Sequence, residues 1–142
     1  MGDRIGFTGT RTMDDPDDAL VIYDIVQELP PDAVLVVGAC VGVDATVARA
    51  GSLSGRTVHA VVPANRAQVD PEFDRYCTSY EVMTEGTSYR DRNVRIVEQA
   101  DRLIVIAQFP EDHPQSDRSG TWQTCRIARR AGKPVEIHVL RQ

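Results

Sequence analysis

The sequence predicts an α/β fold, a Rossmann-like three-layer sandwich with a mostly parallel sheet, formed as a single domain over residues 1–142. Three observations support this prediction. Short apolar runs alternate with amphipathic segments, two of those runs are apolar at every position, and glycine-containing turns follow several of them. Strands that alternate with helices in this way are typical of right-handed βαβ units, and a length of 142 residues is close to the commonest domain size.

Five apolar runs are expected to form strands. The runs at 33–37 (AVLVV) and 103–107 (LIVIA) are apolar throughout, as strands covered by helices on both faces must be. The run at 135–139 alternates between apolar and polar residues, which favours an edge position in the sheet. Segments 4–8 and 57–62 complete the set.

An acidic run around Pro16 has two interpretations, a metal site or the start of a helix. We favour the helix start because Asp15 is suited to cap a helix and Pro16 to occupy its first position. The acidic side chains then complement the positive end of the helix dipole. The acidic run consists of Asp14, Asp15, Asp17 and Asp18. The helix that it starts is expected to end before Pro30.

Three further helices are expected. One covers 43–50, and another begins at Ser88, which forms a capping-box pattern with Asp91. The last carries an apolar stripe and ends at Gly132. The intervening segment is the least clear, and it is expected to hold a short helix near 72–77 and a short strand near 80–83.

Polar and glycine residues follow the expected strands, and in a parallel sheet these loops all emerge at the carboxyl ends of the strands, where open α/β sheets bind ligands. Glycines let backbone N–H groups approach an anion, helix N-termini favour phosphate, and nearby arginines supply charge. We therefore predict a ligand-binding rim that consists of Gly9, Thr10, Arg11, Gly38, Ala39, Gly42, Asp44, Pro63, Asn65, Arg90, Arg92, Asn93, Ser119, Gly120 and Thr121.

Each of these features has a purely structural interpretation when taken alone. A glycine turn such as 38–42 commonly just connects a strand to a helix. Asn93 lies on an otherwise apolar helix face, so it needs a partner in a loop or a ligand. Trp122 could stack on a base or pack beneath the loop at 108–118, which could act as a lid. The gathering of several such features on one rim favours a ligand.

The composition limits the classes of partner. A net charge of −5 and a pI near 5.1 argue against nucleic acid as a partner. The three cysteines are widely spaced and no metal-binding pattern is present, so neither a metal nor a bound cofactor is expected. Without a signal peptide or a long apolar stretch, a cytoplasmic protein with no membrane contact is expected. The three histidines match no Ser-His-Asp spacing.

Short motifs occur in a fixed order along the chain, including Gly9-Thr10-Arg11, Gly38-Ala39-x-x-Gly42-Val43-Asp44, Arg92-Asn93 and Ser119-Gly120-Thr121. This ordered set resembles the SLOG superfamily, most closely its small YspA/YpsA-like members. The relatives of these members are the LOG phosphoribohydrolases, the DprA Rossmann domain and, more distantly, the nucleoside deoxyribosyltransferases. The resemblance implies a Rossmann-like homodimer that binds nucleotides, with a pocket lined by Gly9, Arg11, Gly38, Gly42, Asp44, Arg92, Asn93, Gly120 and Thr121. It is carried by Gly9-Thr10-Arg11, Gly38-Ala39-x-x-Gly42-Val43-Asp44, Arg92-Asn93, Ala100-Asp101, Ser119-Gly120-Thr121 and Gly132-Lys133-Pro134-Val135.

One departure from the LOG pattern affects the expected activity. LOG enzymes carry a PGGxGTxxE-type loop whose glutamate acts in N-glycosidic cleavage, whereas this chain has Gln123 and Thr124 at those positions. An amide cannot serve as nucleophile or general base. Among Asp44, Asp117 and Glu98, none has a spacing that argues for it as a substitute.

The expected function is therefore binding of a nucleotide or a nucleotide-derived ligand, as a sensor or carrier domain. One alternative is a nucleotide N-glycosidase or phosphoribohydrolase with an altered catalytic acid, for which Asp44 and Arg92 are weak catalytic candidates. A second alternative is DprA-like binding of single-stranded DNA, which needs a basic groove lined by aromatic side chains. Whether the protein is an enzyme is left open at this stage.

Overall fold

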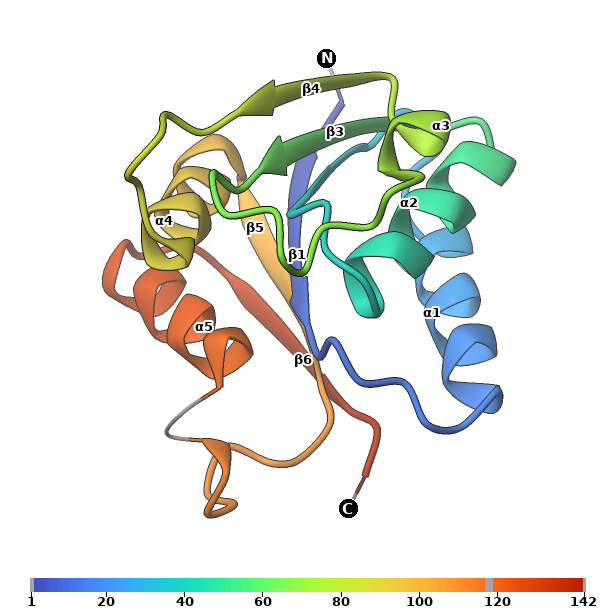
Figure 1. The fold of residues 1–142 in the computed structure, drawn as a ribbon. Helices are drawn as coiled ribbons and strands as arrows, with labels where there is room; N and C mark the ends of the chain where they lie inside the picture. Colours follow the sequence, from blue (N-terminus) through green and yellow to red (C-terminus); the bar gives the residue numbers. More distant parts are fainter. Residues whose placement is uncertain (1, 117–118, 142) are drawn as a thin grey trace.

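A computed structural model describes residues 2–116 and 119–141 of the chain, and it contains one six-stranded sheet between layers of helices (Figure 1). All neighbouring strands pair in parallel, so the Rossmann-like α/β prediction is confirmed. The strand order is β4-β3-β2-β1-β5-β6. The strands are β1 (Arg4–Gly9), β2 (Val34–Val37), β3 (Thr57–Val62), β4 (Ser79–Val82), β5 (Arg102–Ala107) and β6 (Val135–Val139).

The helices cover both faces of this sheet. In Figure 1, α1 and α2 lie on one side, while α4 and α5 lie on the other. The apolar residues of β2 and β5 are buried on both faces, which explains why these strands lack alternation. The helices are α1 (Asp17–Gln27), α2 (Val43–Leu53), α3 (Phe73–Tyr76), α4 (Tyr89–Gln99) and α5 (Gly120–Arg130).

The centre of the sheet determines where a ligand can bind. β1 pairs with β2 on one side and with β5 on the other, and the helices that follow β1 and β5 cover opposite faces. The order of the strands therefore reverses at β1 and β5. In open α/β sheets the crevice beyond the carboxyl ends of the strands at this switch point is the usual ligand site.

The start of α1 agrees with the helix-start interpretation of the acidic run. The Asp15 Oδ1 accepts a hydrogen bond of 2.9 Å from the Asp17 N–H, just ahead of the first turn. Asp18 has a further role that the sequence did not suggest. Its carboxylate is buried and pairs with both terminal nitrogens of Arg141, at 3.0 and 2.7 Å. The backbone N–H of Arg141 donates to the Gln108 carbonyl, so the C-terminal segment is held at the rim.

The predicted capping box is confirmed, because Ser88 and Asp91 exchange reciprocal hydrogen bonds at the start of α4. The short helix and strand expected before it are present as α3 and β4. The last strand, β6, lies at the edge of the sheet as expected, and its Ile137 is 40% exposed.

Two basic side chains stabilise the carboxyl ends of helices. Arg56 donates to the carbonyls of Leu29 and Pro30, just after α1. Lys133 Nζ donates to the Val97 and Ala100 carbonyls at 2.9 and 2.6 Å, at the end of α4. Free carbonyls at a helix end are negative, so both contacts satisfy acceptors and complement the dipole.

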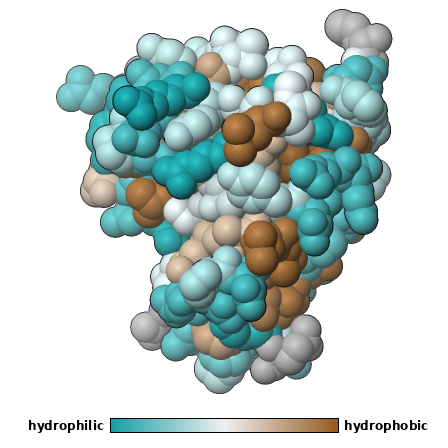
Figure 2. Space-filling model, turned by 90° about the vertical axis from the view of Figure 1, so that its right-hand side faces the viewer, coloured by the Kyte–Doolittle hydropathy of each residue, from teal (hydrophilic) through white to brown (hydrophobic). Residues whose placement is uncertain are grey.

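The outer face of α1 and α2 is mixed in character, and Figure 2 shows apolar side chains interspersed among polar ones there. Large apolar side chains of these two helices are exposed, namely Leu20, Val21 and Leu53. In the described part of the chain, no helix is both long enough and apolar enough to cross a membrane. Asp117, one of the candidate acids named above, lies outside the described residues.

Candidate functional site

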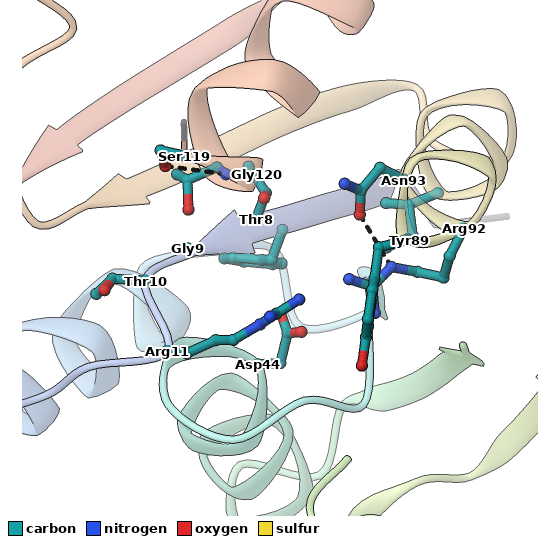
Figure 3. Close-up of a pocket in the computed structure, with 13 residues that line it drawn as sticks. Thr8, Gly9, Thr10, Arg11, Asp44, Tyr89, Arg92, Asn93, Ser119 and Gly120 are labelled. Carbon is teal, nitrogen blue, oxygen red and sulfur yellow. Dashed lines mark hydrogen bonds between the residues drawn. The ribbon is translucent and has the colours of Figure 1, made fainter. Parts of the chain in front are cut away.

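A pocket of about 340 Å³ opens at the carboxyl ends of β1 and β5. This volume lies at the lower end of the range for small-ligand sites. Figure 3 shows side chains from the turn after β1, from α2 and from α4 facing the first turn of α5 across this pocket. Its walls consist of Phe7, Thr8, Gly9, Thr10, Arg11, Asp44, Tyr89, Arg92, Asn93, Ile96, Ser119, Gly120 and Thr121.

Many of the residues predicted from the sequence line this pocket. They come from four separate segments: the turn after β1, the start of α2, the start of α4 and the start of α5. The reversal of strand order brings these segments together. The predicted residues that line the pocket are Gly9, Thr10, Arg11, Asp44, Arg92, Asn93, Ser119, Gly120 and Thr121.

Arg92 is buried beside the pocket and is held by the protein itself. Its side chain is only 5% exposed, although it is charged. Nη1 donates to the Gly38 carbonyl, and Nε donates to the Asn93 Oδ1 at 2.9 Å. Nη1 also lies 3.5 Å from the Cys40 sulfur. The guanidinium is therefore a fixed positive charge whose position is set before any ligand binds.

Asp44 is almost fully buried, and it lies beneath Arg11 in Figure 3. Its Oδ2 accepts a hydrogen bond of 3.3 Å from the Cys40 N–H. Burial raises the pKa of this carboxyl above its ordinary value, although the charges of Arg92 and Arg11 partly offset that effect. The protonated form of Asp44 is thus favoured over that of an exposed aspartate, and it can donate a hydrogen bond.

Arg11 and Tyr89 form one wall of the pocket. The Arg11 guanidinium lies 4.6 Å from the centre of the Tyr89 ring, a cation–π contact. The Tyr89 hydroxyl donates to the Asn65 carbonyl at 2.9 Å, which fixes the ring. Arg92 contacts the same ring, at 5.6 Å. An exposed arginine is thereby held over the buried acid.

The start of α5 presents donors to the pocket. Ser119 caps the helix by accepting from the Thr121 N–H at 3.2 Å. Across the pocket, Asn93 is 6% exposed and its amide nitrogen points toward this turn (Figure 3). A Cβ placed on Gly120 would lie 4.0 Å from the Asn93 Nδ2. Within the described residues no hydrogen bond from this Nδ2 is found, and Asn93 lines the pocket.

Three predicted residues support the pocket from behind. A Cβ at Gly38 would lie 2.4 Å from the Arg92 Nη1, and one at Gly42 would lie 2.5 Å from the Thr10 carbonyl oxygen. These glycines therefore permit close approach of the protein's own atoms rather than of a ligand. Ala39 is buried with a φ of 64°, and its carbonyl accepts from the Asp70 N–H.

Three other predicted residues do not line the pocket. Pro63 and Asn65 follow β3, which lies two strands away from β1 in the sheet. Asn65 still contributes through the carbonyl that binds Tyr89. Arg90 is exposed at the start of α4, on a different side of the helix from Arg92.

The two positions expected to hold a catalytic carboxylate are placed away from the pocket lining. Thr124 is fully buried, and its hydroxyl donates to the Gly120 carbonyl at 2.8 Å within α5. Gln123 is partly buried and does not line the pocket. Glu98 is exposed near the far end of α4. Only Asp44, among the candidate acids in the described residues, reaches the pocket.

Four lining residues were not predicted from the sequence. Tyr89 lies in the first turn of α4, and its hydroxyl and its ring contact the loops that carry Asn65 and Arg11. Thr8, Phe7 and Ile96 belong to a strand or a helix face rather than to a turn. The position of Thr8 at the carboxyl end of a central strand was the one available signal.

A smaller chamber of about 90 Å³ adjoins the pocket beneath the segment 108–116. Trp122 lies in its wall, 3% exposed, with its indole N–H donating to the Phe109 carbonyl at 3.1 Å. Packing under the loop is therefore what the structure shows for this tryptophan. The chamber is lined by Thr10, Gln108, Phe109, Gln115, Ser116, Ser119, Thr121 and Trp122.

A hydrogen-bonded chain of Ser79, His59 and Glu81 lies on the β3–β4 edge, away from the pocket lining. His59 Nδ1 is 2.8 Å from the Ser79 hydroxyl, and its Nε2 is 3.3 Å from Glu81. The sequence spacing had not indicated this contact, because the residues meet only through pairing of neighbouring strands. No cluster of potential metal ligands is found in residues 2–116 and 119–141.

Neither a protein-family model nor a curated protein matches this sequence. Solved structures do match in fold. DNA processing protein A (DprA) from Streptococcus pneumoniae aligns with a TM-score of 0.75 and 19% identity over 96% of this chain. This chain covers 50% of the DprA chain, so it spans half the length of that neighbour.

Two further structures extend the comparison. The molybdenum cofactor binding protein from the phototrophic bacterium Rippkaea orientalis aligns with a TM-score of 0.69 and 22% identity, over 96% of this chain and 76% of that one. A DprA from Helicobacter pylori, described for its single-stranded DNA binding mode, aligns with a TM-score of 0.65 and 18% identity, over 95% and 64%. At these identities the likeness shows a shared Rossmann-like fold.

Proposed function

We propose that this protein binds a nucleotide or a nucleotide-derived small molecule in the pocket at β1 and β5, as a sensor or carrier. The observation that carries the proposal is the amide nitrogen of buried Asn93, which faces the start of α5 across the pocket and has no hydrogen-bond acceptor among the residues that the structure describes. We further propose, on the resemblance carried by the ordered motifs, that the chain is a member of the SLOG superfamily and forms a homodimer. We also propose that it is cytoplasmic.

The phosphate is placed at the first turn of α5. The positive end of a helix dipole and its free N–H groups favour an anion. Gly120 has no Cβ that would block an anion from approaching this turn, and the Asn93 Nδ2 supplies a further donor. Arg92, fixed by its bonds to Gly38 and Asn93, adds positive charge without any loss of side-chain freedom on binding.

The nucleoside is placed toward Tyr89 and Asp44. The Tyr89 ring already carries Arg11 on its face, so a flat base can take the place of the guanidinium or stack against it. The raised pKa of Asp44 favours a protonated carboxyl, which can donate to a sugar hydroxyl or a ring nitrogen. The pocket therefore offers an acidic anchor at one end and anion donors at the other.

A second candidate function is hydrolysis of an N-glycosidic bond. It is favoured by one observation, the buried Asp44 with a raised pKa in the pocket floor. A carboxyl of this kind can protonate the departing base as the glycosidic C–N bond breaks. Water then forms the new C–O bond at the sugar carbon and gives its proton to the Asp44 carboxylate, which restores the acid, while the fixed Arg92 charge holds the phosphate. The weaker candidate, binding of single-stranded DNA, requires a basic groove, whereas this chain carries a net charge of −5.

The test is a panel of nucleoside mono-, di- and triphosphates, read by thermal shift and by chromatography of free base in the same samples. A ligand at about 100 times its Kd should add about 2.7 kcal/mol of stability. Asn93→Leu should weaken binding by roughly 10- to 100-fold, the effect of losing a hydrogen bond to a charged group. Arg90→Ala is the matched control, because Arg90 is exposed and does not line the pocket.

The outcomes separate the candidates. Binding without base release supports the sensor or carrier, and base release that Asp44→Asn abolishes establishes the hydrolase. A salt-dependent gel shift with single-stranded DNA at micromolar protein would support the DNA-binding candidate instead. If no nucleotide binds, or if Asn93→Leu and Arg90→Ala bind equally well, the proposed site is wrong.

A further inference from the structure

We infer that the ligand carries a second group beyond its phosphate, a small uncharged sugar or polyol, which occupies the chamber beneath segment 108–116. The ligand class is then a nucleotide whose terminal phosphate is esterified to a sugar or polyol, rather than a free nucleoside phosphate. This inference rests on the proposed function, because it takes the phosphate to lie at the start of α5.

The two cavities meet at that position. Thr10, Ser119 and Thr121 line both the pocket and the smaller chamber. The first turn of α5 therefore separates two spaces rather than closing one. A phosphate bound there directs one ester oxygen to the pocket and a second oxygen to the chamber. A substituent on that second oxygen therefore enters the chamber.

The chamber is chemically unlike the pocket. Among the residues that the structure describes, those that line the chamber carry no charged side chain, whereas the pocket is lined by Arg11, Arg92 and Asp44. Two amide side chains, Gln108 and Gln115, offer both donors and acceptors. Hydroxyl groups of a sugar match the donors and acceptors that such a lining offers.

Apolar surface completes the match to a sugar. Trp122 and Phe109 line the chamber, and the hydrogen bond from the indole N–H to the Phe109 carbonyl fixes one against the other. The Phe109 ring is also stacked on His113, with ring centres 4.2 Å apart. The C–H face of a sugar can pack on fixed apolar surfaces of this kind, while its hydroxyls reach the amides.

The size of the chamber limits the second group. Its volume is about 90 Å³, close to a quarter of the 340 Å³ of the pocket that is assigned to a nucleoside and its phosphate. A second nucleoside, which would need room comparable to the pocket, does not fit. The chamber thus selects a sugar or polyol and disfavours a dinucleotide.

The experiment measures Kd by calorimetry for matched series of each common ribonucleoside: the 5′-monophosphate, the 5′-diphosphate, the diphosphate-glucose and the symmetrical dinucleoside diphosphate. We expect the diphosphate-glucose of the preferred base to bind at least 10-fold more tightly than the diphosphate. Gln108→Ala and Gln115→Ala should remove this gain and leave the affinity for the diphosphate unchanged. Gln68→Ala, at an exposed position outside the chamber, is the control.

Failure of this inference is distinguishable from failure of the proposed function. If mono- or diphosphates bind and glucose adds nothing, the second group is refuted while the nucleotide site stands. A dinucleoside diphosphate that binds as tightly as the diphosphate-glucose would also refute it, because the size argument would be wrong. If no member of any series binds, the nucleotide site itself fails.

Discussion

Replacing Gly38 by alanine should disturb the buried Arg92 and Asp44 side chains directly. The new Cβ would lie 2.4 Å from the Arg92 Nη1 and 2.7 Å from the Asp44 Oδ2, whereas favourable contacts of carbon lie near 3.5 Å. The guanidinium must therefore move by about 1 Å, which breaks its bonds to the Gly38 carbonyl and the Asn93 Oδ1.

The magnitude follows from the bonds lost and the crowding gained. A hydrogen bond from a charged donor contributes about 1.5–3 kcal/mol, and overpacking costs about 1–3 kcal/mol. Because the two effects relieve each other in part, we expect Gly38→Ala to lower the free energy of unfolding by about 3 kcal/mol. For a chain of this length that corresponds to a fall in Tm of roughly 10 °C.

Urea unfolding followed by circular dichroism measures the effect, and Gly120→Ala is the matched control. A Cβ at Gly120 meets only the Asn93 Nδ2, at 4.0 Å, so this variant should stay within about 0.5 kcal/mol of the natural protein. The double variant Gly38→Ala/Arg92→Met should cost less than the sum of its parts. A Gly38→Ala protein as stable as Gly120→Ala would refute the close approach on which the site geometry rests.

Two contacts outside the pocket give further predictions. The hydrogen bonds from Arg141 hold the pKa of Asp18 below its ordinary 3.8, so the pair stabilises the fold above that pH and the contribution is lost as pH falls further. Asp18→Asn should therefore cost about 1.5–3 kcal/mol at neutral pH and progressively less below about pH 4, as measured by urea midpoints across that range; an offset independent of pH would contradict the ion pair. Lys133→Met should cost about 1–2 kcal/mol, because carbonyls at the end of α4 lose their donor, and amide exchange should accelerate selectively there. Equal exchange rates in both proteins would show that the cap contributes nothing.

Local patterns were sufficient to predict the elements but not their neighbours in the sheet. The capping pattern of Ser88 and the doubly apolar strand runs follow from physics within a few residues of each, and both were predicted. Strand order depends on long-range pairing. Pro63 and Asn65 were therefore placed at the site because they follow a strand, although that strand lies two positions from the switch point.

Side-chain partners were the other part that the sequence could not supply. Arg92 was expected to supply charge to a ligand, and the structure shows that the protein's own carbonyl and amide groups already hold it. The role of Tyr89 was not predicted, because the carbonyl that accepts the hydrogen bond from its hydroxyl lies 24 residues earlier in the chain. Such contacts depend on which loops meet, which is settled only when the sheet is assembled.

The two chain ends leave the sheet at opposite rims, which matters for protein engineering. Because the strands are parallel, the segment before β1 emerges at the amino rim and the segment after β6 at the carboxyl rim (Figure 1). The Arg141 backbone N–H is bonded to the Gln108 carbonyl, and Gln108 lines the small chamber. A fluorescent reporter fused after β6 would therefore lie close to the small chamber and would respond to changes there, whereas one fused before β1 would lie at the opposite rim.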